Sequence, residues 1–576
     1  MSEPPPHHQN SAVDSESLLA SLCDHPEDDL ARLIHADWLE EHGLPERAEL
    51  IRVQVALAGM AYNDPRRPDL EDREHSLLSQ FERDWLGHWP KSVREWRWQR
   101  GFVDQVATDP RTLEQGGLEA WPIDQVSVIA EPWQDLTHSE IPAASASWLK
   151  RVRRWDFSGW GLPITTVFDW LSMHAGARFT ELDLANRPEL QQILSGLERA
   201  RWLPQLKSLT LGAAGHALAY SRDFEPLDPF RLARILNASA VTSLSLFDCG
   251  LTVAGLQRLL CAPLGERLTE LDISGNHLAP DGWQAFHRAP AGMPLRRLDL
   301  SGTALASIAL EPLLHSDCLQ SLVDLDLSRC GSARTNFDVL ARSRFWTQAQ
   351  RLRAHSGTIP ARCLEPLCKA TGPPQLEFLD LADNFLRTEG VAALCEADWS
   401  RSLRWLSLSQ NYLDDDSVRI LAESGRFTQL HSLHLARNNL ELPDTEGEVI
   451  TDLGVRQLAL TPSLARLRIL TLNETDIGDE TVDALLHGPH WKLSCLGIAA
   501  CRLTPAVARI LAESPRLARL EWLDLSGNPR LGGSALRPLL ESPYLSSICE
   551  LDLRGIPLSI RIIEGFEERL GPRFSY

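Results

Sequence analysis

The chain has 576 residues, 43% of them apolar, and a formal net charge of −21. This length and composition are enough to bury a large core. The acidity argues against nucleic acid as a partner, because phosphate binding needs a clustered basic face and the sequence shows none. An acidic protein instead favours protein partners with a basic surface.

Residues 1–14 are rich in Pro, Ser and His, and we expect them to be disordered. Residues 15–59 predict a module of three short helices, with Pro26 and Pro45 at helix starts and Gly43 at a helix end. The predicted apolar stripe of the middle helix consists of Leu30, Leu33, Ile34, Trp38 and Leu39.

The middle helix also carries His35, His42 and several acids, a combination that would suit a catalytic or metal site. The alternative, which we favour, is that the acids face water or pair with Arg32 and Arg47 while the apolar residues fill the core. This interpretation predicts no site in the module.

A specific set of residues lies between Leu18 and Ala58: Asp28, Asp29, Arg32, Ala36, Asp37, Trp38, Leu39, Glu40, Glu41, Gly43, Glu46, Arg47, Ala48, Glu49, Ile51, Arg52 and Gln54. The set closely resembles the bacterial repeat-companion domain, a small module that precedes repeat arrays. The resemblance implies a bacterial origin, and the family has no established activity to carry over to this module. His35 stands where the family often has an aromatic residue, which favours a packing role for it.

Residues 60–150 are expected to cap the first open edge of the repeat array, which would otherwise invite aggregation. A helix is predicted over 71–87, with Leu77, Leu78, Phe81 and Trp85 inward. Strand-like alternation runs from Trp96 to Val106, and Ile123, Val126 and Val128 imitate the repeat pattern that follows.

Over residues 151–576 one pattern, L-x-x-L-x-L-x-x-N, returns mostly at intervals of 27 residues, the signature of a leucine-rich-repeat array. Its first position falls at Val152, Phe179, Leu206, Val241, Leu268, Leu295, Leu322, Ala349, Leu376, Leu403, Leu430, Leu467, Leu493, Leu520 and Ile548. Within one copy, Leu379 and Leu381 point to one side of a short strand and Asp380 to the other. Stacked strands give a parallel sheet, and each intervening segment is long enough for a helix.

A full helix in each repeat resembles the ribonuclease-inhibitor type of leucine-rich repeat. The resemblance implies an α/β solenoid: a horseshoe with an inner parallel sheet and outer helices, preceded by the small helical module. A last helix over Ser559–Leu570 is predicted to close the array.

Position nine of the pattern holds short polar residues that can satisfy the backbone of the bend after each strand. They are Asn276, Asn384, Asn411, Asn438, Asn528, Cys249, Cys330, Cys501, Thr303 and Thr475. Three of the eleven cysteines are thereby structural, and no C-x-x-C pair exists. We therefore expect reduced thiols, no metal site and no cofactor.

The concave face is built from positions three and five. Position five makes it negative, because it holds Asp156, Asp183, Asp272, Asp299, Asp326, Asp380, Asp524 and Asp552. Position three holds Phe378 and Trp405 in adjacent repeats, beside Arg353, Arg404 and His434, with Trp522 as a second, isolated candidate. Aromatic and arginine clusters form binding hot spots, so we predict a partner site here. The alternative is that the two rings only stack on each other.

Two intervals between repeats are long, with extra residues between Gly212 and Pro226 and between Asn439 and Asp452. Both follow a strand, where rim loops often carry binding. The second is acidic, from Glu441 to Glu448, and we expect it to border the partner site.

No apolar run reaches the length of a membrane helix, and the N-terminus lacks signal-peptide features, so we expect a cytoplasmic protein. No catalytic or nucleotide-binding motif is found. The sequence therefore predicts a non-enzymatic protein-protein interaction scaffold that binds its partner on the concave face. The alternative is a regulatory subunit or an enzyme-like effector, GTPase-activating or ubiquitin-ligase-like, which rests on analogy of fold alone.

Overall fold

The computed structural model describes residues 17–60, 66–87, 89–90, 92–109, 113, 118–119, 121–129, 147–158, 163–212, 225–278, 281–303, 307–330, 337–373, 375–439, 449–488, 492–545, 548–571 and 574–576. The expected disordered segment 1–14 falls outside these residues. The chain divides into two compact units, Met1–Leu251 with Ala262–Leu268 (unit 1) and Thr252–Cys261 with Thr269–Tyr576 (unit 2).

Unit 1 begins with helices and continues with alternating strands and helices. Its described elements are α2 (Asp29–Glu41), α3 (Pro45–Gly59), α4 (Arg67–Leu86), β1 (Val93–Gln99), β2 (Phe102–Thr108), β3 (Gln125–Val128), β4 (Arg154–Asp156), α6 (Ile164–His174), β5 (Glu181–Leu184), α7 (Leu190–Arg199), β6 (Ser208–Gly212), α9 (Pro229–Leu236) and β7 (Ser243–Phe247). The three short helices predicted in the module are present, as a helix over residues 17–24 followed by α2 and α3.

The buried face of α2 differs from the predicted apolar stripe. The helix begins after Asp28, whose side chain accepts hydrogen bonds from the amides of Leu30 and Ala31 at 2.9 and 3.1 Å. Its buried residues are Arg32, His35, Ala36 and Leu39. Leu30 and Ile34 are 67% and 48% exposed, so assigning them to the core was wrong. The helix is turned this way because the Arg32 guanidinium donates to the backbone oxygens of Pro26 and Arg100.

Of the two predicted arrangements for the acids of α2, exposure to water is the one observed for Asp37 and Glu40, whose side chains are 69% and 54% exposed. The acids of α2 pair with Arg52, which lies 2.6 Å from both Asp37 and Glu40. Arg47 instead lies over aromatic rings, with its guanidinium carbon 4.6 Å from the Trp98 centroid and 5.0 Å from that of Trp85. Burial lowers the pKa of Arg47 to about 9.

His35 has the packing position that the sequence suggested. It is buried, and its ring centroid lies 5.7 Å from that of Phe102 and 6.0 Å from that of Trp38. Burial, together with the charge of Arg47, lowers the pKa of His35 to about 4, so the ring is neutral at neutral pH.

The stretch from Trp96 to Val106 is a hairpin rather than one alternating strand. β1 and β2 pair antiparallel around Arg100 and Gly101, which have φ angles of 49° and 86°. A Cβ atom at Gly101 would lie 2.3 Å from Cγ1 of Ile51, so glycine also lets α3 approach the turn. β2 then pairs in parallel with β3, and β3 with β4. The parallel ladder therefore already runs before the repeat that starts at Val152.

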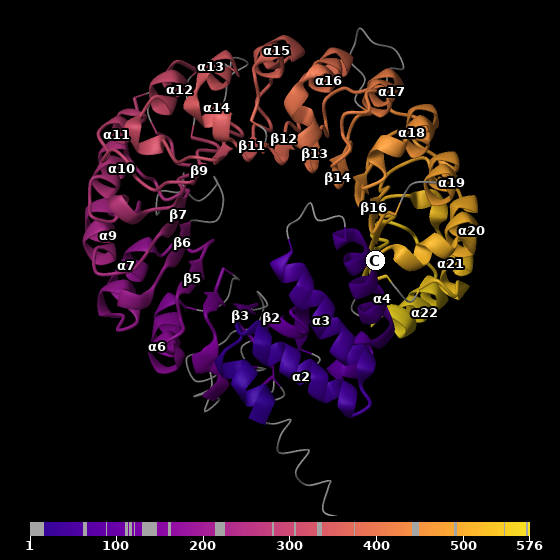
Figure 1. Ribbon diagram of the computed structural model, residues 1–576, viewed down its shortest axis with the longest axis horizontal. Helices are drawn as coiled ribbons and strands as arrows, with labels where there is room; N and C mark the ends of the chain where they lie inside the picture. The colour runs from indigo at the N-terminus through magenta and orange to yellow at the C-terminus, as the bar shows by residue number, and fades with distance from the viewer. Residues whose placement is uncertain are drawn as a thin grey trace, which may run out of the picture. The chain divides into compact units, whose positions relative to one another are not determined.

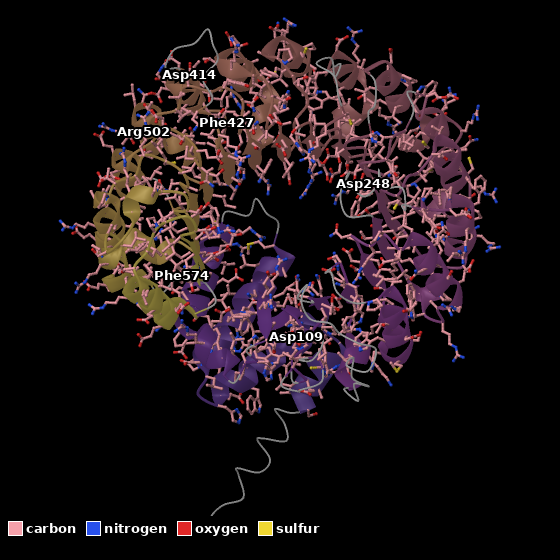
Figure 2. The ribbon with its side chains drawn as sticks, turned by 180° about the vertical axis from the view of Figure 1, so that it is seen from behind. Asp109, Asp248, Asp414, Phe427, Arg502 and Phe574 are labelled. Atoms are coloured by element: carbon pink, nitrogen blue, oxygen red, sulfur yellow. The ribbon has the colours of Figure 1, made fainter. Side chains whose placement is uncertain are left out.

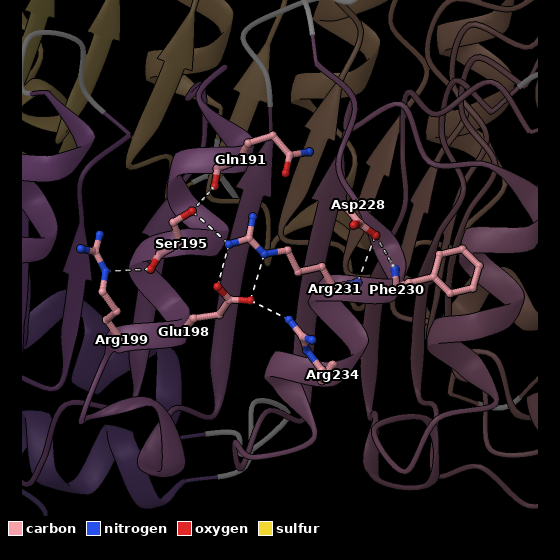
Figure 3. A network of polar contacts seen from close by, with 8 residues as sticks. All are labelled: Gln191, Ser195, Glu198, Arg199, Asp228, Phe230, Arg231 and Arg234. Atoms are coloured by element: carbon pink, nitrogen blue, oxygen red, sulfur yellow. Dashed lines mark hydrogen bonds and ion pairs between the residues drawn. The ribbon is translucent and has the colours of Figure 1, made fainter.

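Neighbouring outer helices of unit 1 are joined by surface ion pairs (Figure 3). Glu198 on α7 lies 2.6 Å from Arg231 and 2.9 Å from Arg234 on α9. These hydrogen bonds lower the pKa of Glu198 to about 2. Asp228 caps α9, accepting bonds of 3.0 Å from the amides of Phe230 and Arg231.

Unit 2 repeats a strand and a helix to its end. Its elements are α10 (Val253–Leu260), β8 (Glu270–Asp272), α11 (Gln284–His287), β9 (Arg297–Asp299), α12 (Ser307–Leu314), β10 (Asp324–Asp326), α13 (Phe337–Arg342), α14 (Arg344–Gln348), β11 (Arg351–Arg353), α15 (Ala361–Lys369), β12 (Phe378–Asp380), α16 (Arg387–Glu396), β13 (Trp405–Ser407), α17 (Asp415–Glu423), β14 (Ser432–His434), α18 (Asp452–Ala459), β15 (Ile469–Thr471), α19 (Asp479–His487), β16 (Cys495–Gly497), α20 (Ala506–Glu513), β17 (Trp522–Asp524), α21 (Arg537–Glu541), β18 (Glu550–Asp552), α22 (Ile560–Leu570) and β19 (Phe574–Ser575).

The strands of unit 2 form a parallel sheet in uniform register. Position-four leucines face one another from strand to strand, as in Leu352, Leu379 and Leu406. In Figure 1 the helices α11 to α22 lie on one side of these strands. Side chains fill the layer between strands and helices, where Phe427 lies (Figure 2). All fifteen residues at the first pattern position are buried, as the repeat requires. The predicted α/β solenoid is confirmed.

The position-nine asparagines form a buried ladder. The Asn384 side chain accepts from the amides of Gly357 and Ile359 at 3.1 and 2.9 Å. It donates to the oxygens of Ala354 and Leu381 at 3.0 and 2.9 Å. Its partners include backbone of the preceding repeat, so the ladder joins repeats as well as closing each bend.

The end of the array matches the predicted closing helix. α22 spans Ile560–Leu570 with Ser559 at its N-cap, and it buries Ile562, Phe566 and Leu570. One element was not predicted: β19 adds a further parallel strand beside β18.

Candidate protein-binding surface

The predicted aromatic pair lies on adjacent strands of unit 2. Phe378 begins β12 and Trp405 begins β13, and the sheet register places them opposite each other. Their ring centroids are 3.9 Å apart with an angle of 6° between the planes. Both side chains are partly exposed. They lie on the face of the sheet opposite the helices, which we call the strand face.

The stack continues on both sides of the pair. The guanidinium carbon of Arg353 lies 4.7 Å from the Phe378 centroid. On the other side, the His434 ring lies 4.8 Å from the Trp405 ring at an angle of 43°. Arg353, Phe378, Trp405 and His434 therefore form one row across β11 to β14, the aromatic row. Because the ring faces are covered by neighbours, the row presents ring edges to solvent.

The two predicted arginines are held by acids. Arg353 donates to Asp324 at 2.9 Å, and its side chain is 17% exposed. The Arg404 side chain is 14% exposed and lies 3.5 Å from a carboxylate oxygen of Glu377. Each arginine is thus fixed in place beside the rings, which lowers the entropy that a partner contact would cost.

His434 is tied into the sheet through both ring nitrogens. Nε2 lies 2.7 Å from the Ser432 hydroxyl and Nδ1 lies 3.0 Å from the Thr471 hydroxyl. Burial lowers the pKa of His434 to about 4, so the ring is neutral at neutral pH. A serine–histidine contact can signal a nucleophile, but Ser432 is only 3% exposed and a base of this pKa accepts protons weakly at pH 7. His434 offers a partner its ring, not its charge.

Trp522 is separate from the aromatic row. It begins β17, in register with Cys495 on β16 and Glu550 on β18. A Cβ atom at Gly497 would lie 3.2 Å from Cζ3 of Trp522, so the indole leans over the glycine of the neighbouring strand. Trp522 therefore lies apart from the aromatic row, and its role in binding a partner stays a prediction.

The position-five aspartates have a local structural role that the sequence did not indicate. Each accepts a hydrogen bond of 2.8 to 3.0 Å from the backbone amide two residues later, at Ser158, Ala185, Ser274, Ser301, Ser328, Ala382, Ser526 and Arg554. These bonds fix the bend after the strand. Burial and the charges of Asp326 and Asp272 raise the pKa of Asp299 to about 6. At this point of unit 2, the crowding of carboxylates that the sequence predicted is present.

A second aromatic pair was missed by sequence reasoning. Phe385 and Tyr412 stack with centroids 5.3 Å apart and an interplanar angle of 9°. Phe385 is 39% exposed. Both residues directly follow a ladder asparagine, in the same two repeats as Phe378 and Trp405. An aromatic residue at position ten in consecutive repeats was the signal that could have revealed them.

Some predicted features fall outside the described residues. They include most of both long intervals, residues 213–224 and 440–448, and with the second the acidic loop from Glu441 to Glu448. Within the described ranges, no three histidine, cysteine or acidic side chains gather as a metal site would need. Over the same ranges, no helix combines the length and apolar character needed to span a membrane.

One family model matches within the repeat array. Residues 268–286 match the family described as Leucine Rich repeat. No curated protein matches the chain. Among solved structures, an internalin from Listeria monocytogenes is 18% identical over 62% of this chain and 92% of its own, with a TM-score of 0.35. The Rad7 and Elc1 complex of yeast gives 18% identity over 70% of this chain and 86% of that one, with a TM-score of 0.42. The pattern, the sheet and the match over residues 268–286 identify the fold as a leucine-rich-repeat solenoid.

Proposed function

We propose that the chain is a non-enzymatic scaffold that binds a protein partner on the strand face of unit 2. The contact is centred on Phe378 and Trp405, flanked by Arg353, Arg404 and His434, with Trp522 as a secondary contact. The observation that carries the proposal is a stacked aromatic row on the sheet face opposite the helices. Large aromatic side chains there fill no core, and such residues dominate the energetics of protein interfaces.

We extend the proposal to the chain as a whole. A net charge of −21 and the crowded aspartates beside Asp299 favour a partner with a basic surface, since a cation would relieve their repulsion. The residues between Leu18 and Ala58 support a bacterial repeat-companion module at 15–59. To this module we add a capping region at 60–150 and a repeat array at 151–576, in a protein that acts in the cytoplasm.

A double substitution, Phe378→Ala with Trp405→Ala, tests the binding site. Burying such a pair against a partner contributes a few kcal/mol, so the variant should lose a partner that wild-type protein captures. Circular dichroism and thermal melting should show an intact fold, because both rings are partly exposed.

The matched control removes two exposed apolar side chains, Phe230→Ala on α9 with Leu460→Ala directly after α18, which are 58% and 65% exposed. This control should retain capture. Equal capture by wild type and the Phe378, Trp405 variant would move the site elsewhere, with Trp522 and then the N-terminal module as the next targets.

A further inference from the structure

A group of basic residues lies at the edge of the sheet where β13 to β15 begin. The amide of His431 donates to the oxygen of Arg404 at 2.8 Å, and the amide of Arg468 donates to the oxygen of His431 at 2.8 Å. These backbone bonds place Arg404, His431 and Arg468 side by side, each directly before one of three adjacent strands. Arg466 joins them, donating to the Gln429 side chain at 2.7 Å. We call these four residues the basic row.

The charge of the basic row comes from its arginines. Burial, followed by the charges of Arg404, Arg468 and Arg466, lowers the pKa of His431 to about 4. The histidine is therefore neutral at neutral pH, and the positive charges that act on it are those of three guanidinium groups. Guanidinium pairs with carboxylate in a planar, two-pronged geometry, so several of them around one point suit a carboxylate ligand.

The basic row borders the aromatic row directly. Arg404 precedes Trp405, and His431 precedes Ser432, which contacts His434. Toward β8 the same face changes sign, because Asp272, Asp299 and Asp326 follow one another on β8 to β10. The sheet of unit 2 thus has an acidic part and an aromatic centre on its strand face, and a basic part at the adjoining edge where β13 to β15 begin. This order of charges fixes the register and the direction in which a bound segment can lie on the sheet.

We infer that the basic row binds a carboxylate group of the protein segment that covers the aromatic row, while basic groups of the same segment lie over β8 to β10. This inference rests on the proposed function and specifies the partner's charge pattern. Adjacent strands are about 4.8 Å apart, so Asp299 on β9 and Arg404, which directly precedes β13, are separated by roughly 19 Å across the strands. An extended segment crosses that distance in about six residues, at roughly 3.3 Å per residue.

A polypeptide fits this surface better than a polynucleotide. The carboxylate of Glu377 lies 3.5 Å from Arg404 of the basic row, and the chain carries a net charge of −21. A continuous phosphate backbone would be repelled along most of the face, whereas a segment with separated basic and acidic groups would match it.

The test uses the full chain and a synthetic peptide of about nine residues, with two lysines at one end, two glutamates at the other and phenylalanines between. A second peptide has glutamine in place of both glutamates. For wild-type protein we expect the change to glutamine to weaken binding about tenfold, measured by isothermal titration calorimetry in low salt. For Arg404→Gln with Arg468→Gln, the two peptides should bind equally.

Three further variants make the result decisive. Arg419→Gln with Arg456→Gln changes the net charge by the same amount on the helix side, where both arginines are exposed, and should behave as wild type. Arg404→Lys with Arg468→Lys keeps the charge and should retain most of the glutamate preference. Phe378→Ala with Trp405→Ala should weaken both peptides alike.

The possible outcomes separate the two proposals. A glutamate preference that survives Arg404→Gln with Arg468→Gln, or that the Arg419, Arg456 control also loses, overturns the inference and leaves the aromatic site standing. The opposite outcome would be loss of the glutamate preference in Arg404→Gln with Arg468→Gln, together with unchanged peptide binding by Phe378→Ala with Trp405→Ala. That outcome would support carboxylate binding by the basic row and refute the aromatic site. A short single-stranded oligonucleotide that binds more tightly than the peptide would overturn the assignment to a protein segment.

Discussion

The substitution Asn384→Ala should be among the most destabilising single changes in unit 2. It removes the acceptor of two buried amides, Gly357 and Ile359, and the donor to the oxygens of Ala354 and Leu381. The Leu381 oxygen keeps the bond from Asn411 at 2.8 Å, so the two amides dominate the loss. A buried group left without a partner costs about 1–3 kcal/mol, which gives an expected loss of about 4 kcal/mol.

Thr303→Ala is the matched comparison for this prediction. Thr303 occupies the same pattern position and is equally buried, but its hydroxyl makes a single hydrogen bond to backbone, to the Leu300 oxygen at 2.6 Å. Its removal should cost about 1 kcal/mol.

Hydrogen exchange read by mass spectrometry is the suitable assay, because repeats open locally and one global unfolding free energy would average them. Amides of the repeats on either side of Asn384 should exchange faster by the factor that corresponds to the local loss. If Asn384→Ala and Thr303→Ala differ by less than about 1 kcal/mol, the asparagine bonds are not what holds the bends.

Three other predictions follow from the structure. Leu39→Ala should destabilise unit 1 by about 2–4 kcal/mol, whereas Leu30→Gln should change stability by less than about 0.5 kcal/mol, because only Leu39 is buried. Equal losses in a denaturant titration would mean that Leu30 is in the core, as the sequence had predicted. All eleven cysteines should react with a thiol reagent in denaturant without reductant, and fewer reactive thiols would reveal disulfides. In the native protein, exposed Cys261 should react before Cys318, because burial raises the pKa of the Cys318 thiol to about 12. The pKa of His434 is about 4 in the folded chain and near 6.5 when unfolded, so its contribution to stability is complete above pH 6.5 and is lost as pH falls toward 4. His434→Gln should therefore reduce the change in the free energy of unfolding between pH 6.5 and pH 4. An unchanged pH profile would count against the burial of this ring.

The repeat interval determined how much of the fold could be predicted. A 27-residue period places Leu379 beside Leu406, and the sheet register then brings Phe378 and Trp405 into contact without further information. The partners of His434 could not be found in this way. Thr471 lies across an interval ten residues longer than the period, so its contact with His434 depends on how that insertion leaves the sheet.

The module shows why residue type alone misplaced a helix face. α2 carries apolar residues on two sides, and periodicity cannot decide which side is inward. The choice depends on Arg32, whose guanidinium reaches the oxygen of Arg100 in a turn 68 residues later. A buried arginine that binds backbone oxygens has no apolar signature, and it places Leu30 and Ile34 toward solvent.

The asparagine ladder gives the array a direction. Asn411 donates to Leu381 and accepts from the amide of Leu386, so each asparagine completes the bend of the repeat that precedes it. Cutting the array between two repeats therefore has unequal effects on the two pieces. In the N-terminal piece, the backbone amides of the last bend lose the asparagine side chain that accepted their hydrogen bonds. In the C-terminal piece, the first asparagine loses backbone partners, and water can replace them. Repeats should be easier to remove or graft at the N-terminal end of such a stack, and a cap designed for the other end has to bring its own side-chain amide.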